Sequence, residues 1–201
     1  MTDEQQKRQV FQVLRDAELY GSKFLLNGEP KSVMVTEPLM MFIAYCNGLD
    51  GGVPSDETVT MNSEKNDIKP LLFPVECVLR DMTIGKQKVF PMHELLPILN
   101  LDGERGQYSH VSPDEPEENA NGVDRLHIDV EVHLPGQPMK HFRVFIPEFQ
   151  VQDLSDGHFL STNLHTMLAV KEHLDMWHID YMMLIPKGLA VDARTLEQEV
   201  Y

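Results

Sequence analysis

The chain has 201 residues, 42% of them hydrophobic and 24% charged, a composition typical of one ordinary globular domain or two small ones. Its 32 Asp and Glu against 17 Lys and Arg give a formal net charge of −15, which argues against direct binding of nucleic acid or of an anionic membrane surface. The N-terminus is too polar for a signal peptide, two cysteines are too few for a disulfide framework, and no apolar run approaches the roughly 20 residues of a membrane-spanning helix. We therefore expect a soluble, cytoplasmic protein.

The acidic residues are concentrated in the second half of the chain. Residues 101–201 contain 18 acidic and 7 basic residues, whereas residues 1–100 contain 14 and 10. The two halves meet in a polar segment, 102–124, which includes the run Asp114-Glu115-Pro116-Glu117-Glu118. Such a segment buries too little apolar surface to offset its ordering entropy, so it predicts a mobile acidic loop. We expect a single domain, 1–201, that carries this loop; two subdomains, 1–101 and 125–201, are the alternative.

The first elements follow from local patterns. Residues 3–20 predict a helix that begins at Thr2 or Asp3 and ends at Gly21, because apolar residues recur on one face at Val10, Val13, Leu14 and Ala17. Residues 23–36 predict a β-hairpin, since the pair Asn27-Gly28 stands between two apolar runs. The rest of this half is expected to hold strands at 39–46, 71–80 and 88–90, a loop at 47–69, and a short helix after Pro91.

The second half shows the clearest pattern. Residues 125–134 alternate strictly between polar and apolar side chains, and residues 139–146 continue the alternation after a Pro-Gly turn, which predicts an antiparallel hairpin with one buried face. A helix is predicted from Ser161 or Thr162 to about His178, with its buried stripe at Met167, Val170, Leu174 and Trp177. A strand at 179–185 and a short helix from Asp192 to Val200 complete an α+β fold, composed of antiparallel β-hairpins with an N-terminal helix, a late amphipathic helix and a short C-terminal helix.

The polar face of the predicted hairpin holds the strongest candidate for a chemical site. Its first strand presents His127, Asp129, Glu131 and His133 on one side, and we expect the return strand to bring His141 and Arg143 opposite them. Imidazoles and carboxylates are the ligands that zinc, iron or manganese accept, so these five His, Asp and Glu residues are candidate ligands of a divalent metal. The competing interpretation is the solvated face of an ordinary strand.

A second group of titratable residues lies on and around the late helix, at His158, His165, Glu172, His173, Asp175, His178 and Asp180. It suggests either a metal site or a general acid–base pair, against the alternative of an exposed helical face. The familiar nucleotide, zinc-protease and serine-hydrolase motifs are missing from the sequence, so no catalytic residue and no cofactor is predicted.

Three functions are compatible with these patterns. The leading hypothesis is a non-enzymatic protein-interaction or accessory module, whose acidic surface attracts a protein partner with a basic surface. The first alternative is a metal-dependent enzyme that uses the hairpin histidines and carboxylates. The second is an acidic mimic of nucleic acid that inhibits a DNA-binding enzyme. The sequence gives no oligomeric state.

Overall fold

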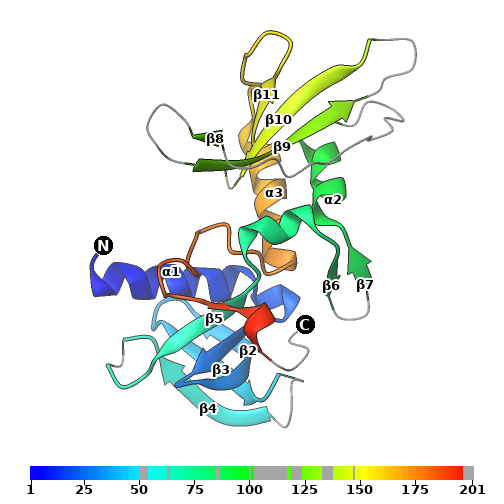
Figure 1. Cartoon of the computed structure of the whole chain (residues 1–201). Helices are drawn as coiled ribbons and strands as arrows, with labels where there is room; N and C mark the ends of the chain where they lie inside the picture. The colour runs from blue at the N-terminus through cyan, green and yellow to red at the C-terminus, as the bar shows by residue number, and fades with distance from the viewer. Residues whose placement is uncertain are drawn as a thin grey trace. The chain divides into compact units, whose positions relative to one another are not determined.

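The computed structural model describes residues 1–49, 54–62, 64–84, 87–99, 101, 117–118, 124–132, 138–146 and 148–196. The chain forms two compact units (Figure 1). Unit 1 consists of Met1–Pro74 and Leu174–Tyr201, and unit 2 consists of Val75–His173. Helices and mainly antiparallel sheets occur together, which confirms the α+β class. Among the described residues, no helix combines the length and the apolar character needed to cross a membrane.

Unit 1 is built on a six-stranded sheet in the order β12-β5-β1-β2-β3-β4. Its neighbouring strands are antiparallel except β12 and β5, which are parallel. The strands are β1 (Lys23–Leu26), β2 (Glu29–Glu37), β3 (Phe42–Asn47), β4 (Pro54–Thr60), β5 (Ile68–Leu72) and β12 (Val191–Asp192). Because β12 comes from the end of the chain, the sheet joins the two separate stretches of unit 1.

Helix α1 (Asp3–Asp16) begins where the sequence predicts. The Thr2 side chain accepts a hydrogen bond from the Gln5 N–H, and the Gln5 side chain accepts one from the Thr2 N–H, so the first turn is closed by a capping box. The α-helix stops at Asp16, earlier than expected, and a short 3-10 turn, η1 (Glu18–Tyr20), follows it. Gly21 then reverses the chain in the left-handed conformation, at φ 78°, as its type predicts.

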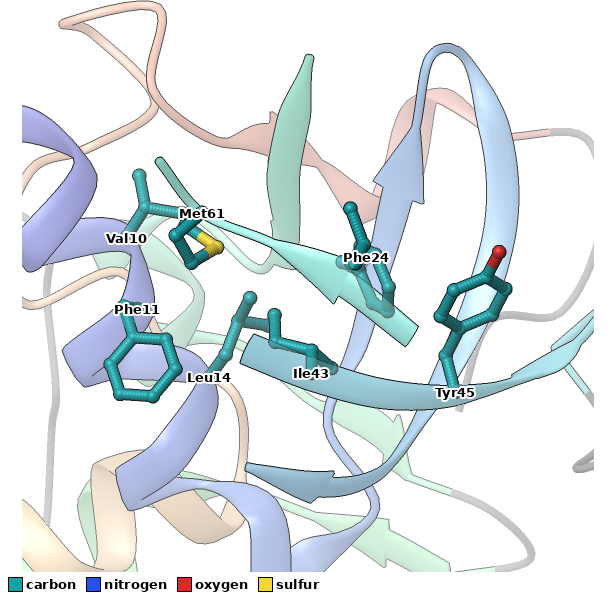
Figure 2. Close-up of a cluster of buried hydrophobic side chains, with 8 residues drawn as sticks. Val10, Phe11, Leu14, Phe24, Ile43, Tyr45 and Met61 are labelled. Atoms are coloured by element: carbon teal, nitrogen blue, oxygen red, sulfur yellow. The ribbon is translucent and has the colours of Figure 1, made fainter. Parts of the chain in front are cut away.

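One face of α1 packs on the sheet. Figure 2 shows the resulting cluster of buried side chains, in which residues of α1 meet residues of β1, β3 and β4 and the residue that follows β4: Val10, Phe11, Leu14, Phe24, Ile43, Tyr45, Val59 and Met61. The Phe24 and Tyr45 rings meet edge to face, with their centroids 6.0 Å apart. The Tyr45 hydroxyl donates to the exposed Glu57 carboxylate at 2.7 Å, which satisfies the polar end of a buried ring and raises the pKa of the tyrosine.

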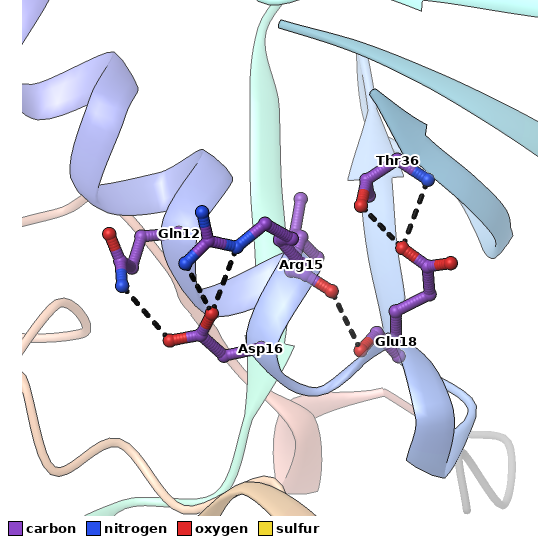
Figure 3. Close-up of polar contacts among 7 residues, drawn as sticks. Gln12, Arg15, Asp16, Glu18 and Thr36 are labelled. Atoms are coloured by element: carbon purple, nitrogen blue, oxygen red, sulfur yellow. Dashed lines mark hydrogen bonds and ion pairs between the residues drawn. The ribbon is translucent and has the colours of Figure 1, made fainter. Parts of the chain in front are cut away.

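Polar contacts fix the end of α1 and attach η1 to the sheet (Figure 3). The Asp16 carboxylate accepts hydrogen bonds from Gln12 and Arg15, at 3.0 Å and 2.7 Å for the shortest pairs. The Glu18 carboxylate accepts from both the backbone N–H and the hydroxyl of Thr36 in β2. The chain therefore leaves the helix in one defined direction.

The predicted β1–β2 hairpin is confirmed. Leu26 pairs with Glu29, and the two turn residues Asn27 and Gly28 have φ values of 53° and 87°. These positive values are those of a type I′ turn, whose twist matches that of the flanking strands.

Two predictions for the first half of the chain are wrong in part. The strand expected at 39–46 begins only at Phe42, because residues 38–41 form the turn between β2 and β3, and Leu39 at its tip is 94% exposed. The loop expected at 47–69 contains β4, which the polar composition of Asp56-Glu57-Thr58-Val59-Thr60 concealed. β4 lies at the edge of the sheet, and among its residues 57–60, whose side chains are described, Val59 is the one that enters the core.

Two further expected strands are interrupted. The apolar run 71–80 divides at Pro74 into the end of β5 and a 3-10 helix, η2 (Val75–Leu79), since proline cannot donate to a sheet ladder. The run 179–185 makes a single bridge at Ile179, opposite Phe73, and then turns. The turn forms because the buried Asp180 carboxylate accepts hydrogen bonds from the N–H groups of Leu184 and Ile185, both at 2.7 Å.

Unit 2 contains a four-stranded antiparallel sheet in the order β11-β10-β9-β8. Its strands are β8 (Glu117–Glu118), β9 (Asp124–Val132), β10 (Lys140–Ile146) and β11 (Gln150–Asp153). One face of this sheet carries side chains that the alternation assigned to the core, all buried: Ile128, Val130, Val132, Phe142, Val144 and Ile146. Val151 of β11, opposite Val144, is buried beside them. The prediction of a half-buried hairpin is therefore confirmed on its apolar side.

The remaining elements of unit 2 are a small ribbon and two helices. Strands β6 (Met82–Ile84) and β7 (Gln87–Val89) pair with each other. The strand expected at 88–90 is therefore present one residue earlier, as β7. Helix α2 (Pro91–Ile98) begins at the predicted proline and buries Met92, Leu95 and Leu96. Helix α3 (Leu164–Met176) belongs to unit 2 up to His173 and to unit 1 beyond it.

Two predicted segments fall largely outside the described residues. Of the acidic segment 102–124, only β8 and the first residue of β9 are described, and they pair with each other as an antiparallel ladder. Of the predicted C-terminal helix, the Asp192 cap is present and accepts a hydrogen bond from the Arg194 N–H. The described part is a 3-10 turn, η3 (Ala193–Thr195), and residues 197–201 lie outside the described residues.

Candidate functional site

The polar face of the β9–β10 hairpin has the cross-strand pairs that the sequence suggests. Glu131 lies opposite His141, Asp129 opposite Arg143, and His127 opposite Phe145. These side chains share the face of the sheet opposite to the buried apolar face, because neighbouring residues of a strand point to opposite sides. The exposure of this face increases along the hairpin, from the buried His127 to the exposed His141.

Asp129 and Arg143 form a bidentate ion pair at the middle of the face. The Arg143 Nε and one of its terminal nitrogens donate to the two Asp129 oxygens at 2.7 and 2.9 Å. The Arg143 side chain is 18% exposed, so the pair is partly protected from water. The guanidinium holds the pKa of Asp129 below its ordinary value, against the opposing effect of burial. The Asp129 carboxylate, a candidate metal ligand, is therefore paired with the Arg143 guanidinium.

His127, at one end of the face, is 1% exposed, which the interpretation of a solvated face did not anticipate. Its ring lies 5.9 Å from the Phe145 ring, and Phe145 in turn lies 5.8 Å from Phe159, both measured between centroids. Phe159 belongs to a segment that returns along β11, where it pairs with Gln152. A row of three aromatic rings thus covers this end of the polar face.

The opposite end of the hairpin face is more open. The His141 Nδ1 lies 3.6 Å from a Glu131 carboxylate oxygen, and the two side chains are 48% and 36% exposed. His133, the fifth candidate ligand, lies outside the described residues. Within the part of the chain that the structure describes, no three His, Cys, Asp or Glu side chains form a group that could hold a metal ion. The metal site at His127, Asp129, Glu131, His133 and His141 stays a prediction.

The second titratable group, on and around α3, divides into exposed and buried residues. His158, His165 and Glu172 are exposed, and His173 Nδ1 lies 2.9 Å from the carbonyl oxygen of Ala169, one turn earlier in the helix. His178 and Asp180 are each 2% exposed, and Asp180 is the turn-forming carboxylate described above. The residues of this titratable group therefore do not share one face of α3.

His178 ends α3 in an unusual way. Its own N–H donates to Asp175 O at 3.0 Å and the Ile179 N–H donates to Leu174 O at 2.9 Å, the two bonds of a Schellman motif. His178 therefore has the left-handed conformation, at φ 53°, where glycine or asparagine is usual. Its Nε2 lies 3.1 Å from Tyr20 O and must carry the ring proton, since a carbonyl oxygen only accepts. Burial lowers the pKa of His178 from 6.5 to about 4, although this hydrogen bond raises it.

The structure also contains an apolar surface that the sequence reasoning missed. Five large apolar side chains lie exposed on α3 and on the segment before it, and we name them the α3 surface: Phe159, Leu160, Leu164, Met167 and Leu168. Leu164 is 75% exposed and Leu168 is 55% exposed. The predicted position of Met167 in the buried stripe of the helix is wrong, because that stripe is formed by Thr166, Val170, Leu174 and Trp177. The spacing of Leu164, Met167 and Leu168 was the signal of a second apolar face.

A shallow groove crosses this surface. Its volume is about 270 Å³, and it is lined by Glu148, Gln150, Phe159, Leu160, Thr162 and Met167. The wall made by Phe159 and Leu160 is held against β11 by hydrogen bonds from the Asp153 N–H to His158 O and from the Leu160 N–H to Val151 O, at 2.9 and 2.8 Å. The wall made by Met167 stands on α3, which Asn163 caps by accepting from the Thr166 N–H at 2.9 Å. Both walls are thus fixed by backbone contacts.

Comparisons of the chain with protein-family models, with curated proteins and with solved structures found no match.

Proposed function

We propose that this protein is a non-enzymatic binding module, and that the α3 surface receives an apolar segment of a basic protein partner. The observation that carries the proposal is the exposure of five large apolar side chains, of which Phe159, Leu160 and Met167 line one groove. Single exposed leucines are ordinary on protein surfaces, whereas a cluster with a polar rim is typical of an interaction site.

The two faces of α3 support this assignment. Its buried stripe already attaches the helix to the fold through Val170, Leu174 and Trp177. The exposed Leu164, Met167 and Leu168 lie one and two positions away from that stripe, so they are not needed to hold the helix in place. A second apolar face on a helix that is already packed is available for a partner.

The size of the groove indicates what it receives. A volume of about 270 Å³ is below the range of roughly 300–1,000 Å³ typical of pockets for small molecules. It suits instead one or two anchoring apolar side chains of a larger partner, around which the neighbouring leucines exclude water.

Charge favours a basic partner. Unit 2 contains 16 acidic and 8 basic residues, and the exposed Glu148 stands at the groove itself. A negative field of this kind accelerates the approach of a cationic segment and disfavours acidic competitors. The expected partner segment therefore alternates apolar anchors with lysine or arginine.

A peptide selection tests the proposal. Random 16-residue peptides displayed on phage are selected against the purified full chain, and the affinities of the enriched peptides are measured by calorimetry. We expect enrichment of Lys, Arg and large apolar residues, and binding at least about tenfold weaker to a Leu164→Gln, Leu168→Gln variant, since buried anchors carry most of the binding free energy of an interface.

The matched control replaces two apolar residues of unit 1 that are more exposed still, Leu39→Gln and Met40→Gln, and it should bind as the natural chain does. Enriched peptides that are acidic, that bind the α3 variant unchanged, or that fail to appear at all would each contradict the proposal.

A further inference from the structure

Unit 1 contains a larger pocket, of about 520 Å³, which is independent of the α3 surface. Four separate stretches of unit 1 enclose it: the first turns of α1, the β1–β2 turn, the segment between β4 and β5, and the Gly188–Leu189 turn. Its volume lies well within the range of small-molecule sites. Its apolar lining comes from Val10 and Met61, two members of the buried cluster drawn in Figure 2, and from the partly buried Ile68 and Leu189 packed against them.

The walls of this pocket are preformed. Asp3, Lys7 and Val10 recur at the spacing that places side chains on one face of α1. On the other side, Asn27 and Asp67 clamp each other: the Asn27 N–H donates to Asp67 O at 2.8 Å, and the Asp67 N–H donates to Asn27 Oδ1 at 2.7 Å. A ligand would therefore meet a shaped cavity and spend little free energy on ordering it.

Positive and negative charges lie at different depths in the pocket. Lys7 pairs with Asp3 at 2.7 Å and Lys69 with Asp67 at 3.6 Å. In both pairs the lysine is the sheltered member: the Lys7 and Lys69 side chains are 25% and 36% exposed, against 77% for Asp3 and 65% for Asp67. A third lysine and a third acid, Lys65 and Glu64, line the pocket as exposed residues.

We infer that this pocket binds a small organic anion, a carboxylate or a phosphate monoester attached to an apolar body. The apolar body contacts Val10, Met61 and Leu189, and the anionic group approaches Lys7 and Lys69, whose present carboxylate partners are exposed side chains that can turn to solvent. The inference stands on the coincidence of an apolar base with sheltered cations in a chain that is otherwise strongly acidic.

Three probes of similar size distinguish the charge of the ligand: phenyl phosphate, benzoate and benzylamine. Each is titrated into the full chain while backbone amide signals are followed by NMR. The signals of Asn27, Ile68 and Leu189 should shift with phenyl phosphate, with benzoate or with both, and the tighter of the two identifies the natural anionic group as phosphate or carboxylate. Benzylamine should bind at least about tenfold more weakly, since its ammonium meets the lysines directly.

A pair of lysine variants locates the site. In Lys7→Gln, Lys69→Gln the tighter anion should bind at least about tenfold more weakly, because two charge-assisted contacts are lost. The control Lys31→Gln, Lys88→Gln removes the same net charge at positions that do not line the pocket, and it should bind as the natural chain does. Equal binding of benzylamine, an unchanged affinity in the Lys7 and Lys69 variant, or no shift of the pocket signals with either anion would overturn the inference. Inorganic phosphate that binds as tightly as phenyl phosphate would overturn the role given to the apolar body.

Discussion

The buried His178 couples the stability of the fold to pH. His178 ends α3 and joins it to Tyr20 within unit 1, and its folded-state pKa of about 4 lies below the 6.5 of an unfolded chain. Above pH 6.5 the ring is neutral in both states, so it adds no pH dependence. Between pH 6.5 and 4 only the unfolded chain binds the proton, so stability falls as the pH falls.

We therefore predict that the free energy of unfolding of the natural chain decreases more steeply between pH 6.5 and 4 than that of a His178→Asn variant. The excess slope should approach about 1.4 kcal/mol per pH unit, the value for one proton. Asparagine is the suitable replacement because it accepts the left-handed conformation and does not titrate. Urea unfolding at several pH values measures both slopes, and parallel curves for the two proteins would contradict the prediction.

The pair formed by Asp129 and Arg143 gives a second prediction at this scale. Replacing Arg143 by Gln should raise the pKa of Asp129 towards its ordinary value and lower the stability at pH 7 by about 1 kcal/mol, because a partly buried bidentate pair is lost. Because the folded-state pKa of Asp129 is depressed, the stabilisation is present above pH 4 and is lost as the pH falls through that pKa. NMR titration of the carboxyl carbon follows the pKa directly. In an Arg143→Lys variant the pKa of Asp129 should lie between its values in the natural chain and in Arg143→Gln. An unchanged pKa of Asp129 in Arg143→Gln would refute this role of the arginine.

At the scale of single elements, the correct predictions are those that depend on interactions between residues close in sequence. The Asn27-Gly28 turn, the Thr2 cap, the Pro91 helix start and the alternation in β9 and β10 each depend on residues within a few positions of one another. The failures have two causes. Ile179 to Ile185 has the composition of a strand, but the Asp180 carboxylate turns it by accepting from N–H groups four and five residues later, a local effect that the apolar pattern conceals. The polar strand β4 forms because β3, a separate segment, offers it a ladder.

The candidate sites also divide into contacts between residues close in sequence and contacts between distant segments. The pairs of His141 with Glu131 and of Arg143 with Asp129 could be expected from the hairpin pattern, because a hairpin register is local. The burial of His127 could not, because the alternation places this residue on the polar face. Its ring packs on Phe145, and Phe145 packs on Phe159, which comes from a different segment. The pocket of unit 1 combines α1 with residues more than 180 positions away, so no local pattern indicates it.

The β1–β2 hairpin gives the prediction at this scale. Gly28 has φ 87°, and a Cβ atom added to it would meet nothing within 4 Å, so the cost of a side chain there comes from the backbone alone. We expect Gly28→Ala to destabilise the chain by about 1 kcal/mol, and Gly28→Asn to cost less, since asparagine tolerates positive φ. Urea unfolding of the two variants tests this order. Equal stabilities of Gly28→Ala and the natural chain would show that the turn does not require the positive φ.

At the scale of the whole molecule, the net charge of −15 acts on every encounter with a partner. A basic peptide selected for the α3 surface should associate more slowly as the salt concentration rises, by about tenfold between 20 mM and 500 mM, because salt screens the attraction. The dissociation rate should change much less, since it is governed by the apolar anchors. Stopped-flow measurement of both rates tests this, and an association rate that does not depend on salt would contradict steering by the acidic chain.

The proposal that a basic partner binds the α3 surface can be tested by following the methyl NMR signals of leucine and methionine residues while a selected basic peptide is added to the full chain. We expect the signals of Leu160, Leu164, Met167 and Leu168 to shift together and to saturate at one equivalent, while those of Leu39 and Met40 stay unchanged. Shifts at Leu39 and Met40 with none at Leu164 and Leu168 would contradict it.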